Sequence, residues 1–401
     1  MLKKMLLFDF VHRCEKYNIV IIVCLYLLLL FSSGFFFRAF NGSLAIAMLF
    51  AVCGVLFVRN RSGIFFSPVQ IVPVFLLLIL FLVSSLFAED ELKYIGINLS
   101  YLLIAFFLSN ILSPQQYFSN YTKLMDVIEI FSLICFVVVL ISPSFFSIFP
   151  LLAYQSGRSA HFALLSFVYT GTALNRNYGI FWEPGAFQFF IIFSMVVKIY
   201  FLRKGLRSIL IDIVCVLTTF SSIGFIALIL FLVMFLNRYK GLFNRFLQVF
   251  ICLFAVIGMN YLYNNLSYDL KYAYFEKNIV AMSEKSDDES ISTRQRSIYY
   301  TLNVIKKSPV LGNGVSGFSE YSMNTMTTLN WFARYGAIFG MIMLYGLWKF
   351  YASGRKSKLE TVELFILSIV VTSTEEFSMN PVYLLPIMYG LKTNREFLLY
   401  G

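Results

Sequence analysis

Long apolar runs separated by short polar connections dominate the chain. A helix needs about 20 apolar residues to cross the hydrocarbon core of a bilayer. Runs of this kind are Tyr17–Phe37, Gly42–Val58, Ile71–Ala88, Ile95–Leu112, Val127–Phe146, Ala186–Leu202, Phe246–Leu262, Thr327–Trp348, Thr361–Thr374 and the shorter Pro381–Leu391. Together with the stretch Ser208–Leu236, they predict an all-α polytopic integral membrane protein of about twelve transmembrane helices. Residues 1–401 then form a single membrane domain.

The stretch Ser208–Leu236 is too long for one ordinary span and tight for two. Small and polar residues interrupt it between Thr218 and Gly224. We therefore expect two short helices that meet near the outer surface of the membrane.

Composition and charge agree with a membrane protein. The chain is 59% apolar and 13% charged, whereas soluble domains average about 45–50% and about 25%. Its net charge is +11, but the cations gather in short clusters between apolar runs, which disfavours nucleic-acid binding. The cations that we expect on the cytoplasmic side of the membrane are Arg59, Arg61, Lys123, Arg203, Lys204, Arg207, Arg238, Lys240, Arg245, Arg355, Lys356, Lys358, Lys392 and Arg395. Because cytoplasmic loops carry the excess of Lys and Arg, this pattern predicts a multi-pass protein of the bacterial inner membrane with both termini in the cytoplasm.

Two connections on the outer side are long, at residues 143–183 and 263–326, and the second is expected to contain a surface helix. Long connections in compact proteins are more often functional than filler. Neither loop contains a cysteine, and neither contains a set of Asp, Glu and His residues with the spacing of metal ligands. We therefore expect no disulfide framework, no metal site and no cofactor there.

The first outer loop ends in a candidate anion site. Pro184 suits the first position of a helix and Glu183 its N-terminal edge. Arg176 lies seven residues upstream at the same membrane surface. An arginine beside a helix N-terminus can bind an anion, and a carboxylate nearby can orient it. The plainer interpretation is a helix with a favourable start.

The second outer loop contains a further pair of cations. Ser292 opens a capping box of the S-x-x-Q form, which predicts a helix that ends at Ser308-Pro309. Arg294 and Arg296 then lie in the first turn, where a cation opposes the helix dipole. Either an anionic ligand or lipid headgroups would explain them. The sequence Gly312-Asn313-Gly314-Val315-Ser316-Gly317 matches G-x-G-x-x-G, but it follows a helix, so we expect a tight turn and no dinucleotide site.

Three segments resemble motifs of bacterial O-antigen and capsule polymerases of the Wzy type. Arg176 with Gly179–Gly185 is similar to the R…G-x-F-x-E-P-G element, and Thr219–Gly224 is similar to T-x-S-x-x-G. Arg294–Arg296 followed by Pro309–Gly314 resembles the R-x…P-x-x-G-x-G stretch. With the expected topology, the resemblance covers nearly the whole chain.

The resemblance implies a membrane glycosyltransferase. Such an enzyme transfers a growing glycan from undecaprenyl diphosphate to a hydroxyl of the next lipid-linked repeat unit, at the outer face of the inner membrane. Its implied partners are undecaprenyl-diphosphate-linked oligosaccharides, the lipid bilayer and a chain-length regulator protein. The related O-antigen ligases commonly carry a histidine in the second outer loop. This chain has none there, and Asn330 is the nearest comparable residue.

Transfer from a diphosphate needs cations to stabilise the departing charge, and preorganised arginines can supply them in place of a metal. The candidates for binding diphosphate and glycan are Arg158, Arg176, Arg294, Arg296 and Arg334, with Asn330 beside them. Glu183 is the candidate base for the acceptor hydroxyl, although it could instead only hold Arg176. A ligase that uses another acceptor and a flippase for lipid-linked oligosaccharides are the alternatives. A flippase should carry cationic residues that line a central cavity within its spans. The spans of this chain carry few charges, and Asp212 is the main charged residue among them.

Overall fold

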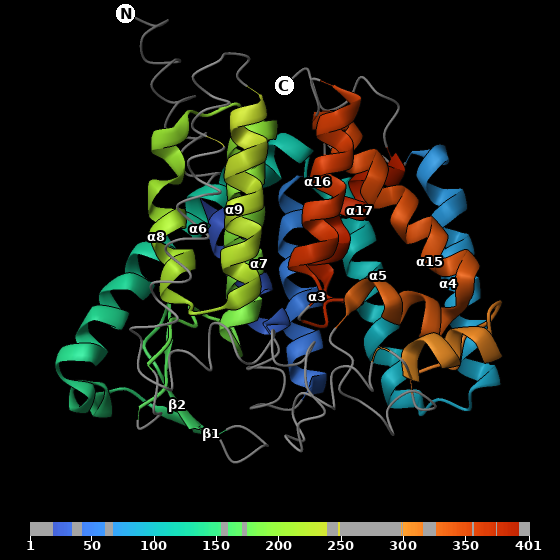
Figure 1. Ribbon diagram of the computed structural model, residues 1–401. Helices are drawn as coiled ribbons and strands as arrows, with labels where there is room; N and C mark the ends of the chain where they lie inside the picture. Colours follow the sequence, from blue (N-terminus) through green and yellow to red (C-terminus); the bar gives the residue numbers. More distant parts are fainter. Residues whose placement is uncertain are drawn as a thin grey trace, which may run out of the picture.

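The computed structural model describes residues 19–33, 42–60, 67–153, 159–170, 175–238, 248, 298, 300–315, 326–354, 357–373 and 375–392. Helices dominate this part of the chain and run side by side, with three short strands gathered at one end, which we call the strand end (Figure 1). The fold is therefore that of an all-α polytopic membrane protein, as the apolar runs predict. Five described helices are long and apolar enough to cross a membrane.

The first described helices follow the apolar runs closely. They are Ile19–Ser32, α3 (Gly42–Arg59), α4 (Pro68–Phe87) and α5 (Leu92–Ile111). The run Phe246–Leu262 lies outside the described residues, so the count of about twelve spans stays a prediction.

The helix α6 (Pro114–Ile141) begins thirteen residues before the apolar run that predicts it. A capping box starts it: the Ser113 hydroxyl accepts from the backbone N–H of Gln116, whose side chain accepts from the backbone N–H of Ser113. A local polar signal therefore sets this boundary, and the apolar run marks only the remainder of the helix.

The first outer loop contains structure that the apolar pattern does not predict. After the 3-10 turn η2 (Pro143–Ile148), strands β1 (Leu151–Ala153), β2 (Ser159–Phe162) and β3 (Phe167–Val168) form an antiparallel sheet in the order β1-β2-β3. The register pairs Leu152 with Ala160 and Phe162 with Phe167. Backbone groups of this loop thus bond to one another at the strand end.

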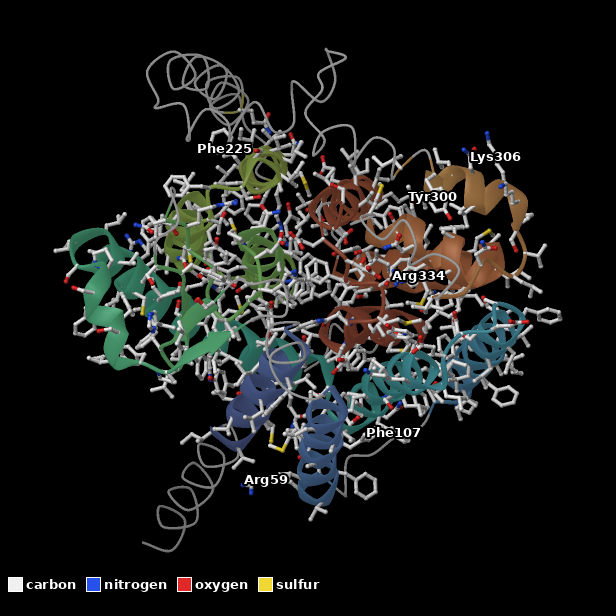
Figure 2. The ribbon with its side chains drawn as sticks, turned by 90° about the horizontal axis from the view of Figure 1, so that it is seen from below. Arg59, Phe107, Phe225, Tyr300, Lys306 and Arg334 are labelled. Carbon is white, nitrogen blue, oxygen red and sulfur yellow. The ribbon has the colours of Figure 1, made fainter. Side chains whose placement is uncertain are left out.

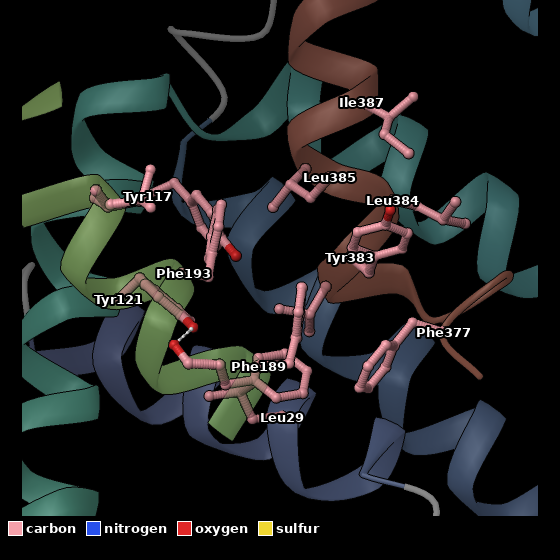
Figure 3. Packing of buried hydrophobic residues seen from close by; sticks show 14 of the residues in the cluster. Leu29, Tyr117, Tyr121, Phe189, Phe193, Phe377, Tyr383, Leu384, Leu385 and Ile387 are labelled. Atoms are coloured by element: carbon pink, nitrogen blue, oxygen red, sulfur yellow. Dashed lines mark hydrogen bonds between the residues drawn. The ribbon is translucent and has the colours of Figure 1, made fainter. Parts of the chain in front are cut away.

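The helix α7 (Pro184–Val196) lies at the centre of the bundle and continues into a π-helical turn, η3 (Val197–Phe201). Of the window Pro184–Phe201, 94% is buried. Aromatic rings surround it: Phe189 and Phe193 pack with Tyr121, Phe377 and Tyr383 (Figure 3). The Tyr121 hydroxyl donates to the carbonyl oxygen of Phe190 at 2.9 Å.

The stretch after α7 divides as expected. Following the 3-10 turn η4 (Leu206–Ile209), α8 (Leu210–Thr218) and α9 (Ser222–Asn237) are separated at Thr219–Ser221, where Phe220 has a φ of 47°. The Ser221 hydroxyl caps α9 by accepting from the N–H of Gly224. Two short helices therefore replace one long span.

The remaining helices are residues 300–307, α15 (Thr327–Gly354), α16 (Lys358–Val371) and α17 (Pro381–Lys392). The sequence predicts α15 as one uninterrupted span, but Gly336 has non-helical angles (φ 83°, ψ 172°) and breaks it. The nine residues before this kink form a separate short segment near the strand end, and its side chains contribute to the candidate site.

Candidate active site at the strand end

The N-terminus of α7 is the point at which the separate motifs meet. Glu183 occupies the N-cap position with an extended backbone, and Pro184 follows at the first helical position. A Cβ on Gly185 would collide with the carboxylate of Glu375, and a Cβ on Gly224 would collide with the side-chain oxygen of Gln188. The glycines of the E-P-G and T-x-S-x-x-G elements therefore allow close approach of neighbouring segments to α7.

The carboxylate of Glu375 lies against the start of α7. Glu375 is 6% exposed and follows α16 in the connection to α17. The positive end of the helix dipole favours a negative charge at this place. In the folded chain, a carboxylate of the protein itself therefore lies at the helix start where the sequence predicts an anion site.

Arg176 holds the end of α8. Its Nε donates to the carbonyl oxygen of Thr219 at 2.9 Å, and its Nη2 donates to that of Phe220 at 2.7 Å. Next to it, Asn177 donates from its backbone N–H to the carbonyl oxygen of Thr218 and from Nδ2 to the Thr218 hydroxyl, both at 3.0 Å. A cation at a helix C-terminus is electrostatically favourable. These contacts join the first resemblance motif to the second.

Glu183 makes no side-chain bond to its own helix. No hydrogen bond or ion pair joins it to Arg176 within the described part of the chain. The guanidinium of Arg176 is oriented by backbone carbonyls, so Glu183 is not needed for that task. Half-buried at the strand end, Glu183 remains the candidate base.

Arg334 lies on the same end of the bundle and forms an ion pair with Glu376. Seen from the strand end, Arg334 lies beside the helix that carries Tyr300 and Lys306 (Figure 2). The side chains of Arg334 and Glu376 are 13% and 37% exposed. The Ser378 hydroxyl also donates to Glu376, at 2.9 Å. The cation is thus held in a largely desolvated position beside the 375–378 segment.

The connection 375–380 links α15 to the start of α7. The Thr327 hydroxyl donates to the carbonyl oxygen of Glu375 at 2.7 Å, and the N–H of Phe377 donates to that hydroxyl at 2.8 Å. Trp331 donates from Nε1 to the carbonyl oxygen of Ser378 at 2.8 Å, and the Phe377 ring packs on Trp182 with centroids 5.7 Å apart. This connection therefore brings Arg334 and the Glu183 segment to one region.

Asn330 is completely buried in the segment before the kink, one residue from Trp331. Its side chain therefore lies inside the packed bundle. Arg158, Arg294 and Arg296 lie outside the described residues, as does the capping box at Ser292–Gln295.

The glycine turn at 312–314 packs on the α15 kink. The N–H groups of Asn313 and Gly314 donate to the carbonyl oxygens of Ala333 and Arg334 at 2.8 and 2.9 Å. The N–H of Val315 donates to the Asp90 carboxylate at 2.9 Å. These amides therefore bond within the protein, and the turn positions Arg334 rather than offering a phosphate cradle.

Residues 208–342 match the family described as O-antigen ligase. This third of the chain is similar to that family. The search of curated proteins and the search of solved structures give no match.

The match to the O-antigen ligase family begins just before α8 and ends in α15, beyond Asn330 and Arg334. It therefore contains the Thr219–Gly224 motif and the glycine turn, whereas Arg176 and Glu183 lie before it. The match supports an O-antigen ligase- or polymerase-type function in general. It also agrees with a multi-pass membrane protein that resembles a glycosyltransferase.

The sequence identifies Arg176, Glu183, Asn330 and Arg334 as candidates but does not identify Glu375 and Glu376 as parts of the site. Those two acids directly follow the apolar run Thr361–Thr374 in a short connection. Two adjacent acids at the end of an apolar run are a signal that could have placed them near the site. Their contacts with Gly185 and Arg334 depend on how distant segments pack.

Proposed function

We propose that the chain is a polysaccharide polymerase. It transfers a growing glycan from undecaprenyl diphosphate to a hydroxyl of the next lipid-linked repeat unit, at the outer face of the bacterial inner membrane. The observation that supports the proposal is that two arginines and three carboxylates lie at the strand end, around the start of α7 and the connection that packs on it. Arg176 is fixed on α8, and Arg334 is fixed beside the connection that also carries Glu375 and Glu376.

In this mechanism the arginines stabilise the diphosphate as the glycan leaves. Held by carbonyl oxygens or by a carboxylate, their guanidinium groups need little reorganisation during the reaction, which is the condition for electrostatic catalysis. Arg158, Arg294 and Arg296 supply further positive charge from the two outer loops.

Glu183 accepts the proton of the attacking hydroxyl. The bond from the sugar to the diphosphate oxygen breaks, and the electron pair leaves with that oxygen. A bond then forms from the acceptor oxygen to the sugar carbon. A carboxylate near an acceptor hydroxyl can serve as this base.

A ligase-type transfer to another acceptor and a flippase are distinguishable from polymerisation. Purified protein is supplied with a lipid-linked repeat unit, and the products are separated by size. A ladder of increasing length supports the proposal. Transfer only to a different acceptor supports a ligase, and movement of the lipid across a vesicle membrane without new bonds supports a flippase. Either of these last results would overturn polymerisation.

The proposed orientation places both termini in the cytoplasm and the loops 143–183 and 263–326 outside. Its basis is the clustering of cations on one side of the spans. A cysteine at position 287, in a chain without other accessible cysteines, should react with an impermeant reagent from the outside only. Labelling from the cytoplasmic side would contradict this orientation.

A further inference from the structure

A second group of charged side chains lies away from the candidate active site. Asp126 and Glu129 of α6 and Asp212 of α8 bring ligand oxygens within 4.8 Å of one another. Lys198, in the π-helical turn η3, donates to Asp126 at 2.5 Å and to the two oxygens of Asp212 at 2.8 and 2.6 Å. Lys198 follows Pro184 by fourteen positions, so at about 1.5 Å per residue the group lies about 20 Å from the start of α7.

The charges of this group do not balance. Three carboxylates face one ammonium, which leaves two negative charges when all four are ionised. The side chains of Lys198 and Asp212 are 0% exposed, and Glu129 is also completely buried. Within the described residues, Lys198 is the only cation that forms a salt bridge with the group. Buried charges require compensation because the interior screens them poorly.

Glu129 is the acid of this group whose charge no salt bridge balances within the described residues. Both of its carboxylate oxygens are buried, and no backbone amide, hydroxyl or cation donates to them; their hydrogen-bonding neighbour is another carboxyl group, that of Asp212. Buried polar side-chain atoms in native proteins are in large majority hydrogen-bonded, and two facing carboxyl groups need a shared proton or a cation between them. Its oxygens belong to the set that lies within 4.8 Å of Asp126 and Asp212.

We propose that Asp126, Glu129 and Asp212 bind one divalent cation of the Mg²⁺, Mn²⁺ or Ca²⁺ class. Donors that are all carboxylate oxygens favour such hard cations. Ca²⁺ binds oxygen at about 2.3–2.6 Å, so two of its ligands can stand about 5 Å apart at most, whereas Mg²⁺, at about 2.0–2.1 Å, would draw them to within about 4.2 Å. The observed separations satisfy the limit for Ca²⁺. Two positive charges from the ion bring the net charge of the group to zero.

Lys198 is compatible with the bound ion. Each carboxylate oxygen has more than one lone pair, so Asp126 and Asp212 can accept from the ammonium and still ligate the cation. The Asp126 side chain is 37% exposed, so the group is not sealed from the surface of the protein.

Such an ion would fasten three helices at the end opposite the candidate active site. Asp126 and Glu129 belong to α6, Lys198 continues α7, and Asp212 lies in the first turn of α8. The helices α7 and α8 carry Glu183 and the carbonyl contacts of Arg176 at their other ends. The ion therefore supports the geometry of the site without touching substrate, whatever reaction the site performs.

The test is direct binding of Mn²⁺ to the purified full-length chain in lipid nanodiscs, followed by electron paramagnetic resonance. We expect one Mn²⁺ per chain, displaced by excess Ca²⁺ or Mg²⁺. Glu129→Gln keeps the shape of the side chain and should weaken binding by at least about tenfold, since loss even of outer-shell partners can cost that much. The bound ion should also raise the unfolding temperature of the wild type but not that of Glu129→Gln.

A matched control is Glu363→Gln, which removes a half-buried acid of α16 that bonds to Asn237 at 3.1 Å. It should bind Mn²⁺ as the wild type does. If Glu129→Gln does not fold, Asp126→Asn provides a second variant at a partly exposed position. Absence of Mn²⁺ binding by the wild type would overturn the proposal and leave protons to balance the group. Equal binding by wild type and the folded ligand variant would also overturn it.

Discussion

Arg176 donates from Nε to the carbonyl oxygen of Thr219 at 2.9 Å, across 43 positions of the chain. With its second bond to Phe220, this contact fixes the first outer loop on the end of α8. The guanidinium thus has a structural task in addition to the diphosphate contact that we propose. The two tasks can be separated by experiment.

Arg176→Lys keeps the charge but loses the planar fork that grips phosphate oxygens and the two carbonyls. If Arg176 contacts the diphosphate, the polymerisation rate should fall by about a hundredfold, as for other preorganised charge-stabilising donors. Expression and membrane insertion should remain intact. The rate is measured with lipid-linked repeat units, and the unfolding temperature is measured on the same preparation.

Arg207→Lys is the matched control, because Arg207 is exposed in η4 beyond the opposite end of α7. It should leave the rate unchanged. Loss of rate together with a large fall in unfolding temperature would assign Arg176 to positioning the α8–α9 turn. Normal ladders from Arg176→Lys at normal protein levels would remove Arg176 from the active site.

Glu183→Gln preserves the size of the side chain but cannot accept a proton at neutral pH. A base role therefore predicts nearly complete loss of polymerisation, with little change in unfolding temperature because Glu183 makes no side-chain cap bond. Glu375→Gln is the comparison, since that carboxylate lies against Gly185 at the same helix start. We expect Glu375→Gln to keep partial activity and to lower the unfolding temperature. The reverse order of activities would transfer the base role to Glu375.

Gly336→Ala should destabilise the protein, because Gly336 combines a φ of 83° with a ψ of 172°. This region of backbone conformation is essentially restricted to glycine, and occupying it with another residue costs on the order of 1–3 kcal/mol. A Cβ at this position would also collide with the carbonyl oxygen of Val310. The free energy of unfolding measured in detergent micelles should fall accordingly, and Arg334 should lose its position together with activity.

Gly96→Ala provides the contrast for that experiment. Gly96 is helical within α5, and a Cβ there would meet nothing within 4 Å. Alanine is favoured over glycine in a helix by about 1 kcal/mol. The variant should therefore be as stable as the wild type or slightly more stable. Equal stability of Gly336→Ala and the wild type would show that the kink is not required.

Glycosyl transfer at the strand end should not need a divalent metal, because arginines supply the positive charge. The carboxylate group at Asp126, Glu129 and Asp212 complicates a simple chelation experiment. EDTA is therefore added to the Glu129→Gln protein, in which that group has lost a ligand. We expect the Glu129→Gln protein to polymerise at the same rate with and without EDTA. A loss of activity that Mg²⁺ or Mn²⁺ restores in this variant would place a required metal at the active site.

The sequence alone predicts most of the helices. The length of each apolar run, the polar interruption at Thr219–Ser221 and Pro184 at a helix start are local features, so the described helices follow them. The same local signals identify Arg176, Glu183 and Arg334 as candidates. The match at residues 208–342 contains two of the three resembling motifs, those at Thr219–Gly224 and Arg294–Gly314.

Only the tertiary structure decides which of these residues meet. Arg176 binds carbonyls of α8, Glu375 reaches Gly185, and Lys198 joins acids that lie up to 72 positions away. Such contacts depend on how segments pack after each helix has formed, and no spacing rule within one helix contains them. For the same reason, three carboxylates that are scattered along the sequence become one buried group, because burial and charge balance are properties of the assembled bundle.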